Sequence, residues 1–188
     1  MTYRVAYIVG SLSAFSVNRV LAQALISVAP EDLEFFEIGI GALPLYNRDL
    51  DADYPAEALA LKDALASAHA VLFVSPEYNR SIPGALKNAI DWASRPWGQN
   101  SFVNMPVAVI GASPGSLGTA LAQQSLRAVL SFLNTRQLTS PEAYVTYRPD
   151  DYSSDGTVAN PRTRDFLTNF MLEFRDHIER VLTVLPRH

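Results

Sequence analysis

The chain has 188 residues, carries a net charge of −4, and is 48% hydrophobic and 18% charged. This length predicts a single domain over residues 1–188, with enough apolar material for a sizeable core. The acidic balance argues against a nucleic-acid partner, which normally needs a basic surplus or stripe. The lack of cysteine excludes disulfides, thiolate nucleophiles and iron–sulfur clusters, and the three histidines are not at metal-ligand spacing. A chain of this composition needs a bound cofactor for any redox chemistry.

No apolar run approaches the roughly 20 residues that a membrane span needs. The first residues, Met1-Thr2-Tyr3-Arg4, lead directly into a strand-like run without a signal-peptide pattern. We therefore expect a cytoplasmic protein with no membrane partner.

Predicted strands and helices alternate along the chain. Short apolar runs typical of strands buried on both faces occupy 5–9, 70–74 and 107–110. A more mixed strand candidate occupies 33–38, and residues 143–145 belong to a fifth strand. Helical spacing and capping or proline signals predict helices over 17–28, 55–68, 83–92, 117–133 and 162–182. This alternation implies right-handed crossovers and an α/β fold. We predict a flavodoxin-like three-layer sandwich, with a five-stranded parallel sheet of order 2-1-3-4-5 and helices on both faces.

Sheets of this kind bind ligands at the carboxyl ends of their strands, beside the switch in strand order. The segments that follow Val9, Val74 and Ile110 are therefore the candidate site, and they are also the most unusual loops of the chain. The third of them, 111–118, contains Ser113 and three glycines that allow close approach of a ligand. It also fits a tight strand-to-helix connection.

The first loop joins a buried strand to a helix whose N-terminus offers unpaired N–H groups and a positive dipole end. Short polar side chains surround that point: Ser11, Ser13, Ser16 and Asn18. The loop lacks both the glycine fingerprint of dinucleotide folds and the Gly-Lys-Ser/Thr of a P-loop. The pattern fits a phosphomonoester, and it also fits an ordinary helix capped by serine.

The second loop, 75–84, is stiffened by two prolines and a glycine and presents Glu77, Tyr78 and Asn79 just past a central strand. A flat heterocycle needs backbone amides for its edge and an aromatic or apolar wall for its face. A stiff surface turn is the alternative interpretation.

These loops resemble those of the NADPH-dependent FMN reductase family, which includes quinone, azo-dye and chromate reductases. The strongest match is Pro76-Glu77-Tyr78-Asn79 followed by residues 81–92. Residues Gly10, Ser11, Leu12, Ser16 and Asn18 are similar to the family's Gly-Ser-Leu-Arg-x-x-Ser-x-Asn phosphate loop, and the likeness extends over about residues 3–145. Ser13 stands where the family usually has Arg, so one charge-assisted phosphate contact is missing.

The resemblance implies FMN as cofactor and NADPH or NADH as co-substrate. The flavin-binding residues that it implies are Ser11, Ser13, Ser16, Val17 and Asn18 at the phosphate, Pro76, Glu77, Tyr78 and Asn79 along the ribityl chain and isoalloxazine, and Ser113 close to the ring. No catalytic side chain is expected, because the flavin carries the chemistry.

The reaction that the resemblance implies passes hydride from NAD(P)H through flavin N5 to a small-molecule electron acceptor: a quinone, an azo compound, a metal oxyanion or free flavin. The alternative is a flavin-binding electron carrier or sensor without reductase turnover. The family also builds part of its flavin pocket at a subunit contact, so we expect a homodimer or homotetramer. The region 92–102, which contains two tryptophans, is the expected contact.

Overall fold

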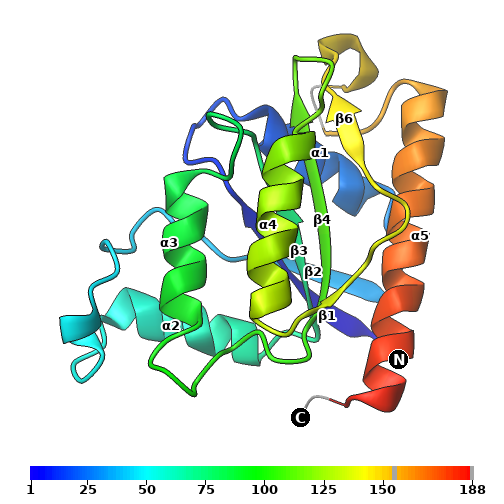
Figure 1. Cartoon of the computed structure of the whole chain (residues 1–188). Coiled ribbons are helices and arrows are strands. Elements are labelled where there is room, and N and C mark those ends of the chain that lie inside the picture. The colour runs from blue at the N-terminus through cyan, green and yellow to red at the C-terminus, as the bar shows by residue number, and fades with distance from the viewer. Residues whose placement is uncertain (154–155, 187–188) are drawn as a thin grey trace.

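The computed structural model describes residues 1–153 and 156–186 and shows strands alternating with helices (Figure 1). The strands are β1 (Tyr3–Val9), β2 (Leu33–Glu37), β3 (Ala70–Val74), β4 (Pro106–Ser113), β5 (Arg136–Gln137) and β6 (Tyr144–Thr146). The helices are α1 (Val17–Ser27), α2 (Ala56–Ala66), α3 (Gly84–Ala93), α4 (Ala120–Phe132) and α5 (Pro161–Val184), with short 3-10 turns η1 (Arg48–Leu50) and η2 (Pro149–Asp151). Within the described residues, no helix is long and apolar enough to cross a membrane.

The sheet confirms the predicted topology. All pairs are parallel, and the order is β2-β1-β3-β4-β5, with β6 also paired to β4. The expected fifth strand is divided in two: β5 pairs with the start of β4, whereas β6 pairs with Gly111–Ser113 at its end. Pro141 lies between the two pieces and has no N–H for a ladder bond, which is consistent with the break.

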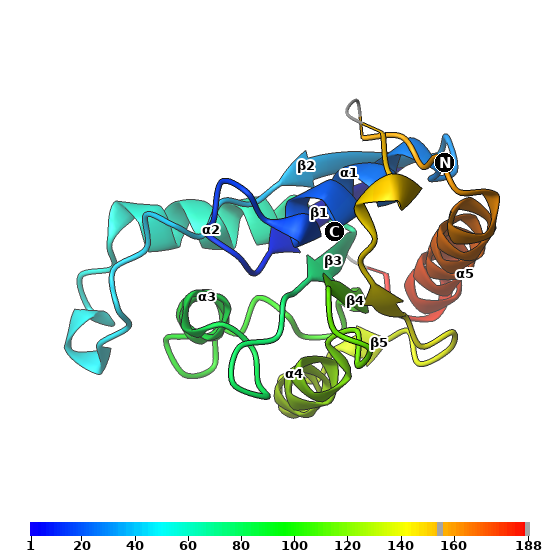
Figure 2. The same cartoon turned by 90° about the horizontal axis from the view of Figure 1, so that it is seen from above.

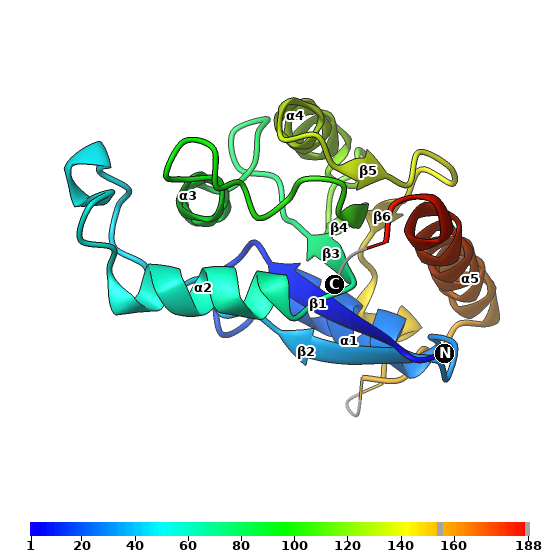
Figure 3. The same cartoon turned by 90° about the horizontal axis from the view of Figure 1, so that it is seen from below.

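Side chains of the central strands alternate between two apolar cores. Val5 and Tyr7 point into a core shared with α1 and α5, whereas Ala6 and Ile8 point into a core shared with α2, α3 and α4. A strand covered on both faces must be apolar at every position, because successive side chains point to opposite faces. This explains the continuous apolar runs, and Figures 2 and 3 show the helices on the two sides of the sheet.

The loop after β4 begins later than predicted. Residues 111–113 still belong to β4, because β6 supplies parallel partners there. Helix α4 then starts at Ala120 instead of 117, since Gly118 and Thr119 both adopt positive φ and cannot continue a right-handed helix. The predicted loop is therefore a short segment, 114–119, between two elements.

Candidate functional site

The carboxyl ends of the three central strands are level with one another. Val9 of β1 is the register partner of Val74 of β3, and Val74 is the partner of Ile110 of β4. The three segments selected from the sequence therefore leave the sheet at one edge, which Figure 2 views from above. The structure brings together the predicted polar loops as expected.

The segment between β1 and α1 is organised by three serine hydroxyls. Ser11 Oγ accepts a hydrogen bond from the N–H of Ser13 at 3.2 Å, and Ser13 Oγ accepts from the N–H of Phe15 at 3.2 Å. Ser16 is the N-cap of α1, and its Oγ accepts from the N–H of Asn18 at 3.2 Å. Each hydroxyl acts as an acceptor within the loop, so its proton stays available for a ligand.

Several backbone donors of this segment are free. Among the described residues, the N–H groups of Leu12, Ala14 and Val17 have no recorded hydrogen-bond partner. Val17 is the first residue of α1, where the N–H groups have no intrahelical acceptor and the dipole favours an anion. Free N–H groups and hydroxyl protons at one helix N-terminus make a site suited to a phosphate group.

The Asn18 side chain makes two hydrogen bonds to the backbone of β4 that the sequence did not predict. Its Nδ2 donates to the carbonyl of Ala112 at 2.9 Å, and its Oδ1 accepts from the N–H of Ala112 at 2.9 Å. Asn18 is almost fully buried. Each end of its amide therefore makes one hydrogen bond to Ala112, and the residue joins the start of α1 to the end of β4, with only one of the two Nδ2 protons used.

The second loop contains a tight hairpin. Tyr78 and Ser81 exchange backbone hydrogen bonds of 2.9 and 3.0 Å, and the two central residues, Asn79 and Arg80, have φ of 51° and 66°. Positive φ at both central positions is the requirement of a type I′ turn, in which asparagine is favoured. The hairpin holds the Tyr78 side chain half exposed at the sheet edge.

Glu77 reaches α4 with one carboxylate oxygen, while the other lies 3.5 Å from Arg80 of the hairpin. Its Oε2 accepts hydrogen bonds from the N–H groups of Leu121 and Ala122 at 3.1 and 3.2 Å. The preceding Pro76 is buried, and its carbonyl accepts from Ser75 Oγ at 2.9 Å. Glu77 therefore bonds the loop to α4, and the buried Pro76 holds the start of the loop in the interior.

Ser113 closes the set of predicted residues. It ends β4, and its Oγ donates to the carbonyl of Gly115 at 3.2 Å. Two residues earlier, Gly111 lies against Ser75: a Cβ on Gly111 would lie 2.1 Å from the Ser75 carbonyl oxygen. From the sequence, Gly111 was expected only to allow close approach of a ligand, although a glycine within a strand is also a signal of close backbone approach.

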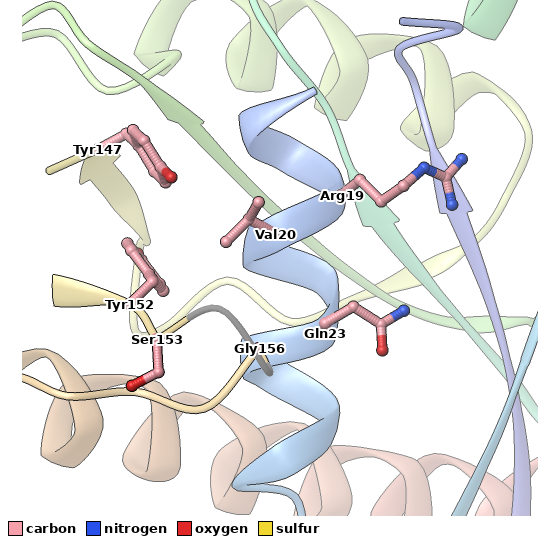
Figure 4. Close-up of a pocket in the computed structure, with 7 residues that line it drawn as sticks. All are labelled: Arg19, Val20, Gln23, Tyr147, Tyr152, Ser153 and Gly156. Carbon is pink, nitrogen blue, oxygen red and sulfur yellow. The ribbon is translucent and has the colours of Figure 1, made fainter. Parts of the chain in front are cut away.

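A cavity of about 460 Å³ lies elsewhere, between α1 and the segment after β6 (Figure 4). It is lined by Arg19, Val20, Gln23, Tyr147, Tyr152, Ser153 and Gly156. The cation of Arg19 is already paired with Glu37 at 2.9 Å, and burial raises the pKa of Tyr152 to about 12. None of the predicted site residues lines this cavity.

We expect Asn79→Ala and Tyr78→Ala each to lower turnover about three- to tenfold, because each removes one polar or ring contact to the expected flavin. Folding should be kept, because both residues lie on a hairpin beyond the sheet. Steady-state rates and circular dichroism measure the two effects. Asn79→Gly keeps the positive φ but removes the amide. Full activity of Asn79→Gly would show that Asn79 acts only through the turn.

The strand order defines a flavodoxin-like fold, and the donor-rich N-terminus of α1 lies at its switch point. The sequence matches the family described as NADPH-dependent FMN reductase over residues 3–150. It is 46% identical over 171 residues to a 2-hydroxy-1,4-benzoquinone reductase of Burkholderia sp, covering 91% of this chain and 93% of that protein. It is 43% identical over 178 residues to a quinone reductase of Pseudomonas putida, covering 94% and 95% of the two chains.

A solved structure is also similar. FerB of Paracoccus denitrificans, a flavoenzyme NAD(P)H:acceptor oxidoreductase, superposes with a TM-score of 0.93 at 47% identity, covering 95% of this chain and 98% of that one. The chain belongs to the NADPH-dependent FMN reductase family. It is therefore an FMN-dependent NAD(P)H oxidoreductase.

Proposed function

We propose that this protein is an NAD(P)H:quinone reductase that holds FMN at the edge formed by the three loops. The observation that carries the proposal is the group of free donors at the start of α1, which lies at the same edge of the sheet as the Tyr78–Ser81 hairpin. A phosphate and a flat ring system need these two features side by side. The quinone as acceptor is supported by the similarity to a 2-hydroxy-1,4-benzoquinone reductase and to a quinone reductase.

At the phosphate end, the hydroxyls of Ser11, Ser13 and Ser16 and the N–H of Val17 are the proposed contacts. Hydrogen bonds from a helix N-terminus to a charged oxygen are stronger than neutral ones. Asn18 is also a proposed contact at this end, since only one of its two Nδ2 protons is used in the bonds to Ala112. It keeps the first turn of α1 against β4 and so fixes where the donors point.

At the ring end, the proposed wall consists of Pro76, Tyr78, Asn79 and Ser113, together with the backbone at Glu77. A bound FMN supplies hydride-accepting and hydride-donating chemistry. The role of the protein is to fix the ring and to present backbone donors to the negative charge that develops on reduction. The half-exposed Tyr78 leaves a face of the site open, so that NAD(P)H and the acceptor can occupy it in turn.

The test is NADPH oxidation by the purified protein with FMN and a benzoquinone. We expect turnover that requires FMN and increases when the benzoquinone is added, with ping-pong kinetics from the shared open face. An electron carrier or sensor would bind FMN but would not turn over NADPH, and that result would overturn the proposal.

We further propose that residues 1–188 form one FMN-binding domain and that the protein acts in the cytoplasm, where its NAD(P)H co-substrate is available.

We also propose that the protein assembles as a homodimer or larger. Of the expected contact region, Trp92 and Phe102 are core residues, exposed by 0% and 1%. Trp97 remains a candidate contact at 79% exposed, and Leu45 of the neighbouring loop is 84% exposed. Aromatic and apolar anchors of this kind favour an interface. Light scattering across a dilution series measures the assembly, and a fully active monomer would contradict it.

The Ser13 position offers a gain-of-affinity prediction. Ser13 is exposed in the loop before α1, where the family usually has Arg. We expect Ser13→Arg to tighten FMN binding by about 1 kcal/mol, roughly fivefold, because a charged donor replaces a neutral one while solvent and chain entropy reduce the benefit. Titration at two ionic strengths checks this, since added salt screens an exposed pair. Riboflavin, which lacks the phosphate, is the control, and an equal gain for riboflavin would show that residue 13 does not face the phosphate.

A further inference from the structure

Helix α4 begins without a cap of its own. Its N-cap, Thr119, adopts φ of 70°, and its side chain makes no capping hydrogen bond. An N-cap residue normally has extended backbone and accepts from the second or third N–H of the helix. The Thr119 hydroxyl instead accepts from Gln123 Nε2 at 3.1 Å. The N–H of Ala120 donates to the Leu117 carbonyl at 2.9 Å, so the N–H groups of Leu121 and Ala122 are the ones that depend on a partner from another part of the chain.

Glu77 is that partner. Its Oε2 accepts from the N–H groups of Leu121 and Ala122, which are the second and third residues of α4. The Glu77 side chain is only 12% exposed, and its other oxygen lies 3.5 Å from Arg80. A carboxylate at this point gains from charge-assisted hydrogen bonds and from the positive end of the helix dipole.

The contact joins two segments of the proposed flavin site. Glu77 lies directly before the Tyr78–Ser81 hairpin, and α4 directly follows the segment after β4. A second tie is provided by the hydroxyls of Ser81 and Ser125, which are 3.0 Å apart. The hairpin and the start of α4 are thus held together by side chains 44 residues apart in sequence.

We propose that Glu77 is a positioning residue for the flavin: its carboxylate caps α4 and thereby fixes the hairpin wall relative to the wall after β4. This inference rests on the proposed function. Without the carboxylate, the N–H groups of Leu121 and Ala122 lose their acceptor, and the hairpin keeps only the Ser81–Ser125 contact to α4. The flavin ring then has to order the two walls when it binds, and the entropy lost in doing so weakens its affinity.

The affected part of the site is the ring end, so FMN and riboflavin should lose affinity equally. We expect Glu77→Ala to bind both flavins about tenfold more weakly, which is the scale of a lost helix cap. Glu77→Gln keeps an oxygen acceptor, and about two- to threefold weaker binding is expected because the charge is lost. Ser16→Ala is the contrasting variant, since it should weaken FMN binding and leave riboflavin unchanged.

The experiment is equilibrium dialysis of both flavins against the wild type, Glu77→Ala, Glu77→Gln and Leu130→Val, with thermal midpoints recorded for each. Leu130 is fully buried in the last turn of α4, and its variant controls for a general loss of stability in the same helix. Acetate is then added to Glu77→Ala, with chloride as control, because a small carboxylate can occupy the vacated space at the helix N-terminus. We expect acetate alone to recover part of the flavin affinity.

Unchanged flavin affinity in Glu77→Ala would overturn the inference, as would a loss for FMN alone. Equal weakening by Leu130→Val at an equal thermal midpoint would assign the effect to stability in general and also overturn it. If the wild type binds neither flavin, the proposed function itself fails, which is distinct from wild-type binding that Glu77→Ala leaves intact.

Discussion

Asn18→Ala is expected to lower the free energy of unfolding by about 3 kcal/mol and to weaken FMN binding, although Asn18 does not need to touch the phosphate. On the β3 side of β4, the strand pairing ends at Ile110. The last backbone hydrogen bond there runs from the N–H of Ser75 to the Ile110 carbonyl at 3.0 Å. Ala112 lies two residues beyond that point. The amide of Asn18 takes the place of the missing strand there, with 2.9 Å bonds to both backbone groups of Ala112.

The physical reason for the size of the effect is burial. Removing the amide leaves the N–H and the carbonyl of Ala112 without partners in the interior, and each such group costs roughly 1–3 kcal/mol. Chemical denaturation measures the loss in free energy. The matched control is Asn169→Ala on the exposed side of α5, for which a change within about 0.5 kcal/mol is expected.

Asn18→Asp separates the two bonds. Its carboxylate can still accept from the Ala112 N–H, but it faces the Ala112 carbonyl oxygen and can donate only when protonated. Its stability relative to the wild type is therefore expected to fall as pH rises through the carboxyl range, because burial and the facing oxygen raise the pKa of the folded state above that of the unfolded state. A deficit that does not depend on pH would show that the bond to the carbonyl contributes little.

The features that the sequence predicted well are those encoded locally. The unbroken apolar runs predicted the parallel sheet because a strand between two helical layers has no polar face. Ser16 was recognisable as a cap from its place before an apolar-periodic segment, and the structure confirms its bond to the Asn18 N–H. The three loops were selected because parallel strands end at one edge, and the register of Val9, Val74 and Ile110 confirms that they do.

The features that the sequence did not predict depend on contacts between distant segments. The partner of Asn18 lies 94 residues away, and the partner of Glu77 lies 44 residues away. An Asn or Glu in a polar motif carries no local sign of which distant backbone group its side chain will bond. The start of α4 also involves a distant residue, because Thr119 makes no capping bond and Glu77 accepts from the N–H groups of Leu121 and Ala122 instead.

Gly111→Ala should be the most damaging substitution of one small residue for another at this edge of the sheet. A Cβ at this position would lie 2.1 Å from the carbonyl oxygen of Ser75 and 2.4 Å from Thr119 Oγ1. The first neighbour is backbone at the end of β3, so it can yield only if the strands separate. Overpacking typically costs 1–3 kcal/mol, and with a fixed backbone neighbour we expect about 3 kcal/mol or more, roughly a 10 °C fall in the melting temperature.

Two further glycines give a graded control for this prediction. A Cβ on Gly10 would meet only side-chain atoms at 3.1–3.3 Å, and one on Gly84 would meet nothing within 4 Å. Gly10→Ala is therefore expected to cost about 1 kcal/mol, while Gly84→Ala, in the first turn of α3, should be neutral or stabilising by up to about 1 kcal/mol. Thermal melts of the three variants, with FMN titrations on those that fold, test the order.

Because Gly111 holds the end of β4 against Ser75 and Thr119, Gly111→Ala should lose flavin affinity along with stability. A Gly111→Ala protein as stable as Gly84→Ala would mean that the strand ends are not packed as closely as this geometry requires, and the flavin walls would then need another means of support.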